Sequence, residues 1–591
     1  MAATRTSSTR RESVDVPLSP VRAGAAAVER TLSASRIPAS TRMIPFKSVV
    51  KVFVVTAKPN CLLPWQMGRQ ESCTGSAFHI AGERLLTNAH VVRDYTTVRV
   101  RRHGGAEKYK AKVLCINHAC DLAILAVDDA AFWKGMTPLS ISKKIPELYE
   151  NAMVIGYPLG GDNICVTRGV VSRVTTLPYE DPKFFLPSQE LIAIQLDAAI
   201  NSGNSGGPAL DESGSIIGVA FSGYAGSADN IGYIIPHPVI YNFLKQFEAS
   251  AEVSRVCDLG IGYMLCENPS LRERHKIVAP ASGVLVTKVA PLSAAAKAGI
   301  QKDDVLMRID ACNIQNDGTI DFREDERLSF QHKVSSRVIG ESLHFEILRS
   351  GKLLQLDVPG VPTPELVPRH RQVGTSPSYL IVGGVVFTKM TCGLLDVAVE
   401  VLSEGAWQRG REPKKDADEE VIVVISVLGH PVNHGYEIHR LPLLKEFNGK
   451  PVLNMRELRR KVMAVKEGFL HFLLGEGKSI IFDAKACRDS EDEIFKTYAI
   501  PAPCSPDLLE GSAAAAAPAP RKSAKRGSFV AKGKAKAKAN GKAASKTTSS
   551  KSPSSKPTKR PADSKNAKGK AAAEKGMRSS KRTRLSAKAS L

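Results

Sequence analysis

The sequence predicts a mainly β protein that is divided into several domains. Its 591 residues exceed the length over which one hydrophobic core normally grows, so more than one domain is expected. Short apolar runs broken by Gly, Pro and Asn fill residues 45–250, a pattern typical of a barrel or sandwich. The last part of the chain is rich in Lys and Ala and has almost no large apolar residues, which predicts a basic, unfolded tail.

Residues 1–44 are rich in Arg, Ser and Ala, contain no lysine and show no hydrophobic periodicity. We expect this segment to be disordered. The same composition also suits an organelle transit peptide, so a targeting role stays open. The start lacks the apolar core of a secretory signal, and no apolar run reaches about 18 residues, so we expect no membrane association.

The strands expected in residues 45–250 are short apolar runs bounded by turn residues. They are Ser48–Thr56, Thr97–Val100, Ala152–Tyr157, Leu191–Leu196 and Ser215–Phe221. The segment from Pro238 to Phe247 is expected to form the helix that closes this domain.

The most informative stretch is Asn201–Pro208, in which Ser205 lies among glycines. Glycine permits the left-handed angles and the close approach that a tight, hydroxyl-presenting loop needs. The backbone N–H groups of Gly203 and Ser205, with Asn204 as a further candidate, can then stabilise a developing oxyanion. A serine hydroxyl alone is a weak nucleophile, so a base and an orienting acid must also be present.

The base candidate is His90 and the orienting acid candidate is Asp121, both at the ends of apolar runs that are expected to be strands. A lone histidine beside apolar residues is more often packed in a core, and a lone aspartate there is more often a turn residue. Here both precede Ser205 along the chain, at spacings of 31 and 84 residues. Three such motifs together favour nucleophilic catalysis by a His–Asp–Ser arrangement, an order known from one class of catalytic triads.

These motifs together resemble the Deg/HtrA family of serine proteases. The segments that carry the resemblance are Thr87–Val92, Asp121–Ile124, Gly156–Pro158, Gly169–Ser172, Gly203–Pro208 and Gly232–Pro236. The resemblance covers roughly residues 47–505 and implies a chymotrypsin-like double β-barrel over residues 45–250, with the triad between two six-stranded barrels. Val50–Phe53, Pro64–Gln66 and Leu259–Asn268 are similar to the nuclear Deg proteases of plants and algae.

The resemblance also implies the chemistry: an ATP-independent serine endopeptidase that needs no metal and no other cofactor. Ser205 would be the nucleophile, His90 the general base and acid, and Asp121 the group that orients the imidazole. The residues that would line the substrate pocket are Ile200, Asn201, Ala220, Phe221, Ser222 and Gly223. Because these residues are small or apolar, with no acid at Asn201, the pocket is expected to prefer small or medium apolar side chains.

Two PDZ-like domains are expected after the protease domain, over residues 257–362 and 376–505. In the first, Leu259, Gly260, Ile261 and Gly262 would occupy the loop that holds the carboxylate of a bound peptide. The second opens at Gly384–Phe387 and continues with a buried strand at Val421–Ile425 and a helix from Met455 to Val465. A structural rather than peptide-binding role is open for the first domain and is favoured for the second.

Residues 506–591 comprise an Ala/Pro linker and a Lys-rich tail. Residues 521–591 contain 23 Lys and Arg but only two acidic residues, whereas the rest of the chain is nearly neutral. Lys581, Arg582 and Arg584 are candidates for a nuclear-targeting signal. The tail is also suited to salt-dependent, non-specific contact with nucleic acid phosphates. The 11 cysteines show no disulfide framework, which favours a reducing compartment.

The expected partners are protein or peptide substrates and further copies of the chain, since the family forms homo-oligomers built on trimers. We expect a protease of protein quality control in the nucleus, with the nucleolus as a narrower location. A chloroplast or mitochondrial location is the alternative if residues 1–44 are a transit peptide. A catalytically inert scaffold associated with chromatin or RNA is the alternative function.

Overall fold

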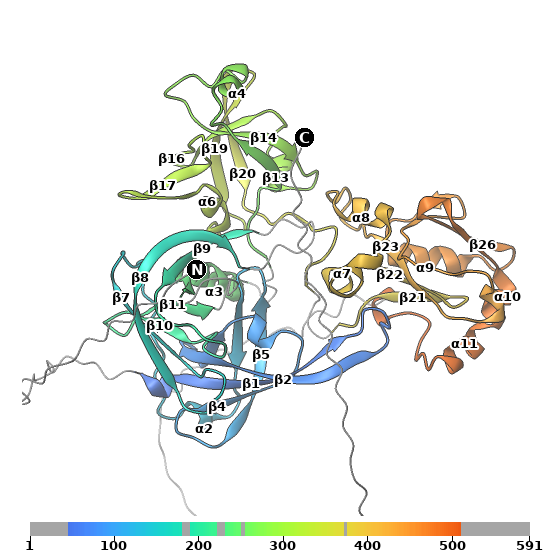
Figure 1. Cartoon of the computed structure of the whole chain (residues 1–591), viewed down its shortest axis with the longest axis horizontal. Coiled ribbons are helices and arrows are strands. Elements are labelled where there is room, and N and C mark those ends of the chain that lie inside the picture. The colour runs from blue at the N-terminus through green and yellow to red at the C-terminus, as the bar shows by residue number, and fades with distance from the viewer. Residues whose placement is uncertain (1–44, 180–188, 222–230, 250–254, 371–374, 510–591) are drawn as a thin grey trace, which may run out of the picture. The chain divides into compact units, whose positions relative to one another are not determined.

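The structure is a computed structural model that describes residues 45–179, 189–221, 231–249, 255–370 and 375–509 (Figure 1). The N-terminal segment, the basic tail with Lys581, Arg582 and Arg584, and part of the expected pocket therefore lie outside the described residues. None of the described helices is long and apolar enough to cross a membrane.

The first domain begins with a closed barrel in the strand order β1-β2-β3-β6-β5-β4. Its strands are β1 (Val49–Pro59), β2 (Met67–Ile80), β3 (Arg84–Thr87), β4 (Tyr95–Arg102), β5 (Lys108–Asn117) and β6 (Leu122–Ala126). Alternate residues face the interior because side chains alternate along a strand, so Val50, Val52 and Val54 of β1 are buried. Short helices flank these strands, namely η1 (Phe46–Ser48), η2 (His90–Val92) and α2 (Ala130–Trp133).

A second closed barrel follows in the order β10-β11-β12-β9-β8-β7. Its strands are β7 (Asn151–Gly156), β8 (Cys165–Pro178), β9 (Glu190–Leu196), β10 (Pro208–Leu210), β11 (Ile216–Phe221) and β12 (Gly232–Pro236). Helix α3 (His237–Ala249) ends the domain and buries Val239, Ile240 and Phe243. The expected double barrel and its closing helix are thus confirmed, with strand ends that differ by a few residues.

The first of the two expected PDZ-like domains forms a sheet in the order β13-β14-β15-β19-β20, with β16 paired to β15 and a separate β17–β18 hairpin. Its strands are β13 (Ile261–Leu265), β14 (Val284–Val289), β15 (Val305–Ile309), β16 (Cys312–Asn313), β17 (Thr319–Arg323), β18 (Glu326–Ser329), β19 (Ser342–Arg349) and β20 (Lys352–Pro359). Its helices are α4 (Pro269–Arg274), α5 (Ala294–Lys297) and α6 (Gln331–Ser335). The Ser293 side chain caps α5 by accepting from the Ala296 N–H at 3.1 Å.

The second expected PDZ-like domain contains two sheets, β21-β22-β23 and β25-β24-β26-β27. Its strands are β21 (Tyr379–Val382), β22 (Val385–Lys389), β23 (Ile422–Val427), β24 (Leu444–Phe447), β25 (Lys450–Pro451), β26 (Phe469–Leu474) and β27 (Ser479–Asp483). Its α-helices are α7 (Cys392–Ala398), α8 (Glu404–Gly410), α9 (Met455–Ala464), α10 (Ala484–Asp489) and α11 (Glu491–Thr497), and its 3-10 turns are η3 (Val399–Val401), η4 (Pro431–Asn433), η5 (Gly475–Gly477) and η6 (Pro506–Leu508). The helix expected from Met455 is confirmed as α9.

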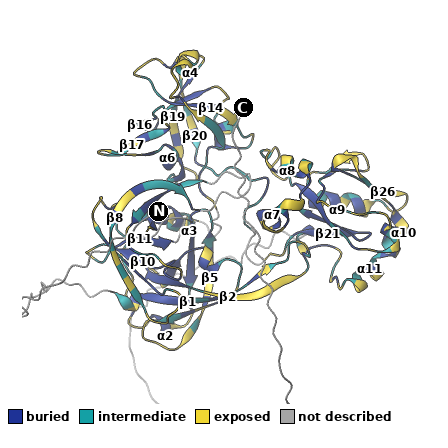
Figure 2. Ribbon diagram, viewed as in Figure 1, coloured by how far each residue is buried: buried dark blue, intermediate teal, exposed yellow. Residues whose placement is uncertain are grey.

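Burial follows the predicted pattern of apolar strands. Figure 2 shows dark blue strands in each domain and a yellow stretch along β2. That exposed stretch is the first half of β2, from Met67 to Cys73, whereas the second half from Gly75 to Ile80 lies in the barrel. β2 was not among the strands expected from the sequence, and its exposed half carries no apolar alternation.

Candidate active site

His90 and Asp121 lie side by side in the first barrel. His90 is the first residue of η2, three positions after the end of β3 at Thr87, and Asp121 directly precedes β6. The His90 ring nitrogen Nδ1 lies 2.7 Å from Asp121 Oδ2, and the His90 backbone N–H donates to Asp121 Oδ1 at 2.8 Å. Because β3 pairs with β6, the ends of the two strands bring these residues together. The carboxylate therefore fixes both the ring and the backbone of the histidine.

The backbone around Asp121 is held by further hydrogen bonds from the histidine segment. The Asn88 side-chain amide and the Ala89 backbone N–H both donate to the Asp121 carbonyl, at 2.9 and 3.1 Å. Asp121 is buried and has a φ of 50°, an angle that aspartate tolerates better than most residues. This arrangement makes Asp121 a rigid acceptor rather than a surface turn residue.

The pKa of His90 responds to two opposing effects. Burial lowers it, but the negative charge of Asp121 and the hydrogen bond to that carboxylate outweigh burial, so the pKa is raised above its ordinary value of 6.5. The side chain keeps 45% of its surface exposed. A histidine with this partner and this access to solvent is suited to exchange protons with a substrate.

Ser205 lies in a tight loop that leads into β10. Gly206 has a φ of 83°, and a Cβ at this position would lie 2.2 Å from the Ser76 carbonyl oxygen. Gly203 has a φ of 98°, and a Cβ there would lie 2.5 Å from the Tyr157 carbonyl oxygen. Both positions therefore require glycine for conformational and steric reasons. The glycines in the motif shape the loop, as the sequence predicted.

Ser76 of β2 joins the serine loop to the first barrel, and sequence reasoning did not identify it. Its Oγ donates to the Gly203 carbonyl at 2.7 Å and accepts from the Tyr157 N–H at 2.8 Å. Its backbone N–H donates to the Ser205 carbonyl at 2.9 Å. Ser76 is fully buried. The only signal in the sequence was a serine beside the apolar run of β2, which is too common to single out.

The backbone donors expected for the oxyanion differ in whether they are already hydrogen-bonded within the described part of the chain. Neither the Gly203 nor the Ser205 N–H donates to another residue in the described part of the chain. The Asn204 N–H, in contrast, donates to the Asn201 carbonyl at 2.9 Å, and Asn204 itself is buried. The geometry thus separates Gly203 and Ser205 from Asn204, whose N–H is engaged inside the loop.

The serine and the histidine are not hydrogen-bonded to each other in this arrangement. Within the described residues, Ser205 Oγ makes no hydrogen bond with His90, and Ser205 is only 4% exposed. The His90–Asp121 pair is assembled, whereas any proton transfer between Ser205 and His90 would need the two side chains to form a hydrogen bond. Such contacts often tighten only when substrate binds.

The expected pocket residues differ in their surroundings. Asn201 is exposed, Ile200 is partly buried, and Ala220 and Phe221 are buried in β11. The Phe221 ring packs against Tyr179 with ring centres 4.8 Å apart, inside the second barrel. Ala220 exchanges backbone hydrogen bonds with Gly206 and Gly207, so it borders the serine loop directly. Ser222 and Gly223 lie outside the described residues.

The expected peptide loop of the first PDZ-like domain lies at the start of β13, which is the terminal strand of its sheet. Leu259 is buried, Gly260 has a φ of 67°, and Ile261 and Gly262 begin β13. The Gly260 carbonyl accepts from the Ala290 N–H at 2.8 Å, and the Leu259 carbonyl accepts from the Ala295 N–H at 3.1 Å. The loop is thus fixed beside α5, with β13 as the adjoining strand.

Three domain families match this chain. The trypsin-like peptidase domain matches residues 75–219, and PDZ domains match residues 257–359 and 367–507. Among solved structures, the HtrA-type protease AlgW with decapeptide has a TM-score of 0.40 and 24% sequence identity, over 54% of this chain and 97% of that chain.

Full-length relatives are similar over most of the chain. Protease Do-like 2, chloroplastic, of Arabidopsis thaliana is 38% identical over 470 residues, which are 78% of this chain and 75% of the relative. Protease Do-like 4, mitochondrial, of the same organism is 38% identical over 79% of this chain and 87% of the relative. The protein is a serine endopeptidase with a trypsin-like domain and two PDZ domains, and the chain belongs to the Deg/HtrA family of serine proteases.

Proposed function

We propose that the chain hydrolyses peptide bonds with Ser205 as nucleophile, His90 as general base and acid, and Asp121 as the orienting group. The observation that supports this most is the double hydrogen bond between Asp121 and the ring and backbone of His90. Ser205 Oγ attacks the scissile carbonyl while His90 Nε2 takes its proton. His90 then donates that proton to the leaving amine, and a water molecule, activated by the same nitrogen, releases the acyl group from Ser205.

The Gly203 and Ser205 N–H groups are proposed to hold the oxyanion. Their lack of any partner in the described chain supports this role, because such donors must be free to meet the negative charge that develops in the transition state. Asn204 is left out of the oxyanion site, since its N–H already donates to Asn201.

The proposed substrates are misfolded or partly unfolded proteins with small or medium apolar side chains at the cleaved position. Ile200 and Ala220 support this preference, since they are apolar residues of the segments that flank the serine loop. The neutral Asn201 argues against a preference for basic side chains, which an acidic residue would attract. We further propose that the active form is a homo-oligomer built on trimers, which sedimentation analysis of the full chain tests.

The proposed catalysis is tested by comparing the full chain with Ser205→Ala. The readouts are cleavage of casein and labelling by a fluorescent fluorophosphonate, which reacts with activated serines. Both signals should be present in the unsubstituted chain and absent in the variant. Labelling without cleavage would indicate a competent serine whose substrate access is controlled. Absence of both signals in the unsubstituted chain would favour an inert scaffold instead.

The proposed location is the nucleus, and the support is the basic tail with Lys581, Arg582 and Arg584. The names of the two relatives point to chloroplasts and mitochondria and favour the alternative. Fluorescent full-length chain is compared with versions that lack residues 1–44 or 521–591. Loss of nuclear signal with the tail supports the proposal. Organelle signal that disappears with residues 1–44 and is unchanged without the tail contradicts it.

A further inference from the structure

Two cations of the first barrel lie directly opposite each other and share one carboxylate from the second barrel. Lys51 of β1 and Arg101 of β4 are register partners in the antiparallel pair β1–β4. Like charges in such a position repel each other, so the arrangement needs an anion that contacts both. Asp162, in the connection between β7 and β8, is that anion. The Lys51 side chain is only 6% exposed, which makes an uncompensated charge there costly.

The two cations hold the β7–β8 connection through its backbone as well as its carboxylate. Lys51 Nζ donates to Asp162 Oδ1 at 2.8 Å and to the Gly161 carbonyl at 2.7 Å. Arg101 donates to Asp162 Oδ2 at 3.1 Å and to the Asp162 carbonyl at 3.0 Å. The hydrogen bonds from Lys51 and Arg101 lower the pKa of Asp162 to about 2, so the carboxylate is charged at neutral pH. We refer to Lys51, Arg101 and Asp162 as the clamp.

The connection also contacts the serine loop, three residues before the clamped aspartate. The Leu159 N–H donates to the Ser202 carbonyl at 2.8 Å. The Ser202 carbonyl and the Gly203 N–H belong to one planar, trans peptide unit, so they point in opposite directions. A donor that holds this carbonyl therefore also fixes the direction of the Gly203 N–H, which is one of the two proposed oxyanion donors.

Two glycines separate Leu159 from Asp162, so the connection depends on its contacts at both ends. Gly160 has a φ of 93°, and a Cβ added at Gly160 or Gly161 would meet no atom within 4 Å. The space around both positions is therefore open, and glycine has more conformational freedom than any other residue. The clamp supplies the fixed point from which the backbone returns to Leu159 in a defined shape.

We propose that Asp162 is a positioning residue for peptide hydrolysis, because it fixes the β7–β8 connection and, through Leu159, keeps the Gly203 N–H directed at the oxyanion. This inference rests on the proposed use of Ser205 as nucleophile. Removing one oxyanion donor lowers kcat by about 10²-fold to 10³-fold. Loss of its orientation is a smaller change, so releasing the clamp lowers kcat by about tenfold to a hundredfold.

The test compares the full chain with Asp162→Ala, which removes a largely exposed carboxylate and leaves the core intact. The control Asp128→Ala removes another exposed carboxylate of the first barrel, which pairs with Lys112. The readouts are kcat and KM for a chromogenic peptide, and the inhibition constant of an aldehyde of the same peptide, which forms a tetrahedral adduct with an active serine.

Asp162→Ala should lower kcat by about tenfold to a hundredfold and leave KM unchanged. The aldehyde should bind more weakly by the same factor, since the oxyanion of its adduct uses the same donors. The control Asp128→Ala should match the parent in all three values. A kcat and an aldehyde inhibition constant equal to those of the parent in Asp162→Ala would overturn the proposal.

A second variant separates positioning from stability. Asp162→Ala leaves Lys51 and Arg101 opposite each other without their carboxylate, so the melting temperature should fall. Adding Arg101→Gln removes one of the two charges and should recover part of that loss, while kcat stays low. Recovery of kcat in step with stability would overturn the proposal. A parent chain that neither cleaves the peptide nor reacts with the fluorophosphonate would contradict the chemistry proposed for Ser205, and this inference would fail with it.

Discussion

At the scale of single residues, the contact between Asp121 and His90 carries the proposed chemistry. Asp121→Asn keeps the shape of the side chain but replaces the carboxylate that holds the imidazole in the required tautomer. We predict that kcat falls by about 10⁴-fold, as expected when the orienting acid of a triad is neutralised. The measurement is the steady-state hydrolysis of a chromogenic peptide. A variant that melts at the parent temperature and retains full kcat would contradict the assigned role.

The same pair determines the pH dependence. His90 must be neutral to accept a proton, and the Asp121 charge raises its pKa above 6.5. We therefore predict that kcat/KM falls as the pH drops through this raised pKa. In Asp121→Asn the residual activity should fall at a lower pH, because burial, which lowers the pKa, is then no longer opposed by a charge. An unchanged midpoint in the kcat/KM profile would show that His90 is not the titrating group.

The raised pKa of His90 also makes the stability of the folded chain depend on pH. Protonated His90 is favoured in the folded chain, so its contribution to stability is fully present below the unfolded pKa of about 6.5. That contribution is lost as the pH rises through the folded value. The substitution Asp121→Asn should remove this dependence, which thermal melting across that pH window measures.

Ser76 is predicted to be a positioning residue for the serine loop. Ser76→Ala leaves the Gly203 carbonyl without a donor and the Tyr157 N–H without an acceptor in a buried site. We expect a loss of about 1–3 kcal/mol in stability and a kcat lowered by up to about 10²-fold, because the nucleophile loses its fixed position. The exposed Ser140→Ala is the control. If kcat and the fraction of protein labelled by the fluorophosphonate fall by the same factor, unfolding alone explains the loss of activity. Ser76 would then have only a structural role.

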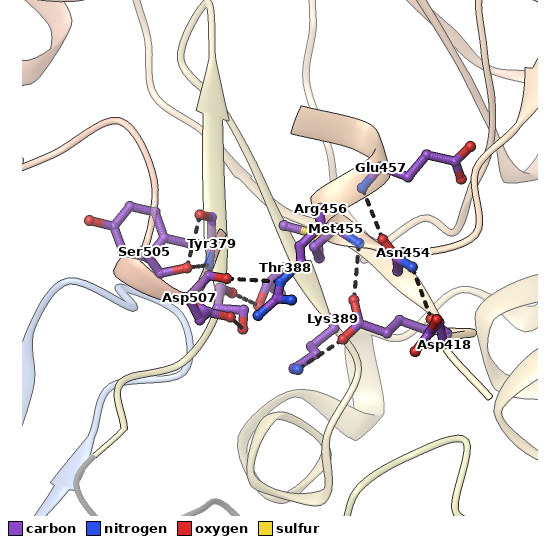
Figure 3. A network of polar contacts seen from close by, with 12 residues as sticks. Tyr379, Thr388, Lys389, Asp418, Asn454, Met455, Arg456, Glu457, Ser505 and Asp507 are labelled. Carbon is purple, nitrogen blue, oxygen red and sulfur yellow. Dashed lines mark hydrogen bonds and ion pairs between the residues drawn. The ribbon is translucent and has the colours of Figure 1, made fainter. Parts of the chain in front are cut away.

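At the scale of elements, the start of helix α9 in the second PDZ domain shows how side-chain contacts fix a helix end. Helix α9 is capped by Asn454, whose side chain accepts from the Glu457 N–H at 2.9 Å and donates to the Asp418 carbonyl at 3.1 Å (Figure 3). The adjacent Met455 N–H donates to Glu420, which also pairs with Lys389. These contacts fix the start of α9.

We predict that Asn454→Ala destabilises α9 by about 1 kcal/mol, the usual cost of losing an N-cap. Deuterium exchange over residues 455–464 should become faster by about fivefold, since RT is about 0.6 kcal/mol. Asn454→Asp keeps the acceptor and is the control. Unchanged exchange in Asn454→Ala would show that the neighbouring contacts alone hold the helix start.

At the scale of the whole molecule, the charge is distributed unevenly along the chain. Residues 521–591 carry 23 basic and two acidic residues. We predict that deleting them abolishes most binding to a 30-base-pair DNA duplex and reduces its salt dependence, because lysine contacts with phosphate release counterions. Casein cleavage should be unchanged. Equal DNA affinity at 50 and 200 mM salt in both versions would contradict the electrostatic role.

Local patterns in the sequence were sufficient for the architecture and for the residues of the proposed triad. Apolar alternation located β1, β4, β7, β9 and β11, and the glycines around Ser205 indicated a loop whose left-handed angles the structure shows at Gly203 and Gly206. Such features depend on neighbours in the chain, so a single sequence records them. β2 was not predicted, since its exposed extension from Met67 to Cys73 leaves little apolar signal.

Tertiary structure alone decided the contacts between distant segments. The hydrogen bond from Ser76 to the Gly203 carbonyl spans 127 residues, and Leu380 pairs with Cys504, which lies more than a hundred residues further along the chain. The sequence favoured a structural role for the second PDZ domain but gave no sign that Leu380 of β21 pairs with Cys504. A backbone hydrogen bond between strands is made by groups that every residue carries. Side-chain patterns therefore predict that a strand forms, whereas only the folded chain determines which edge it meets.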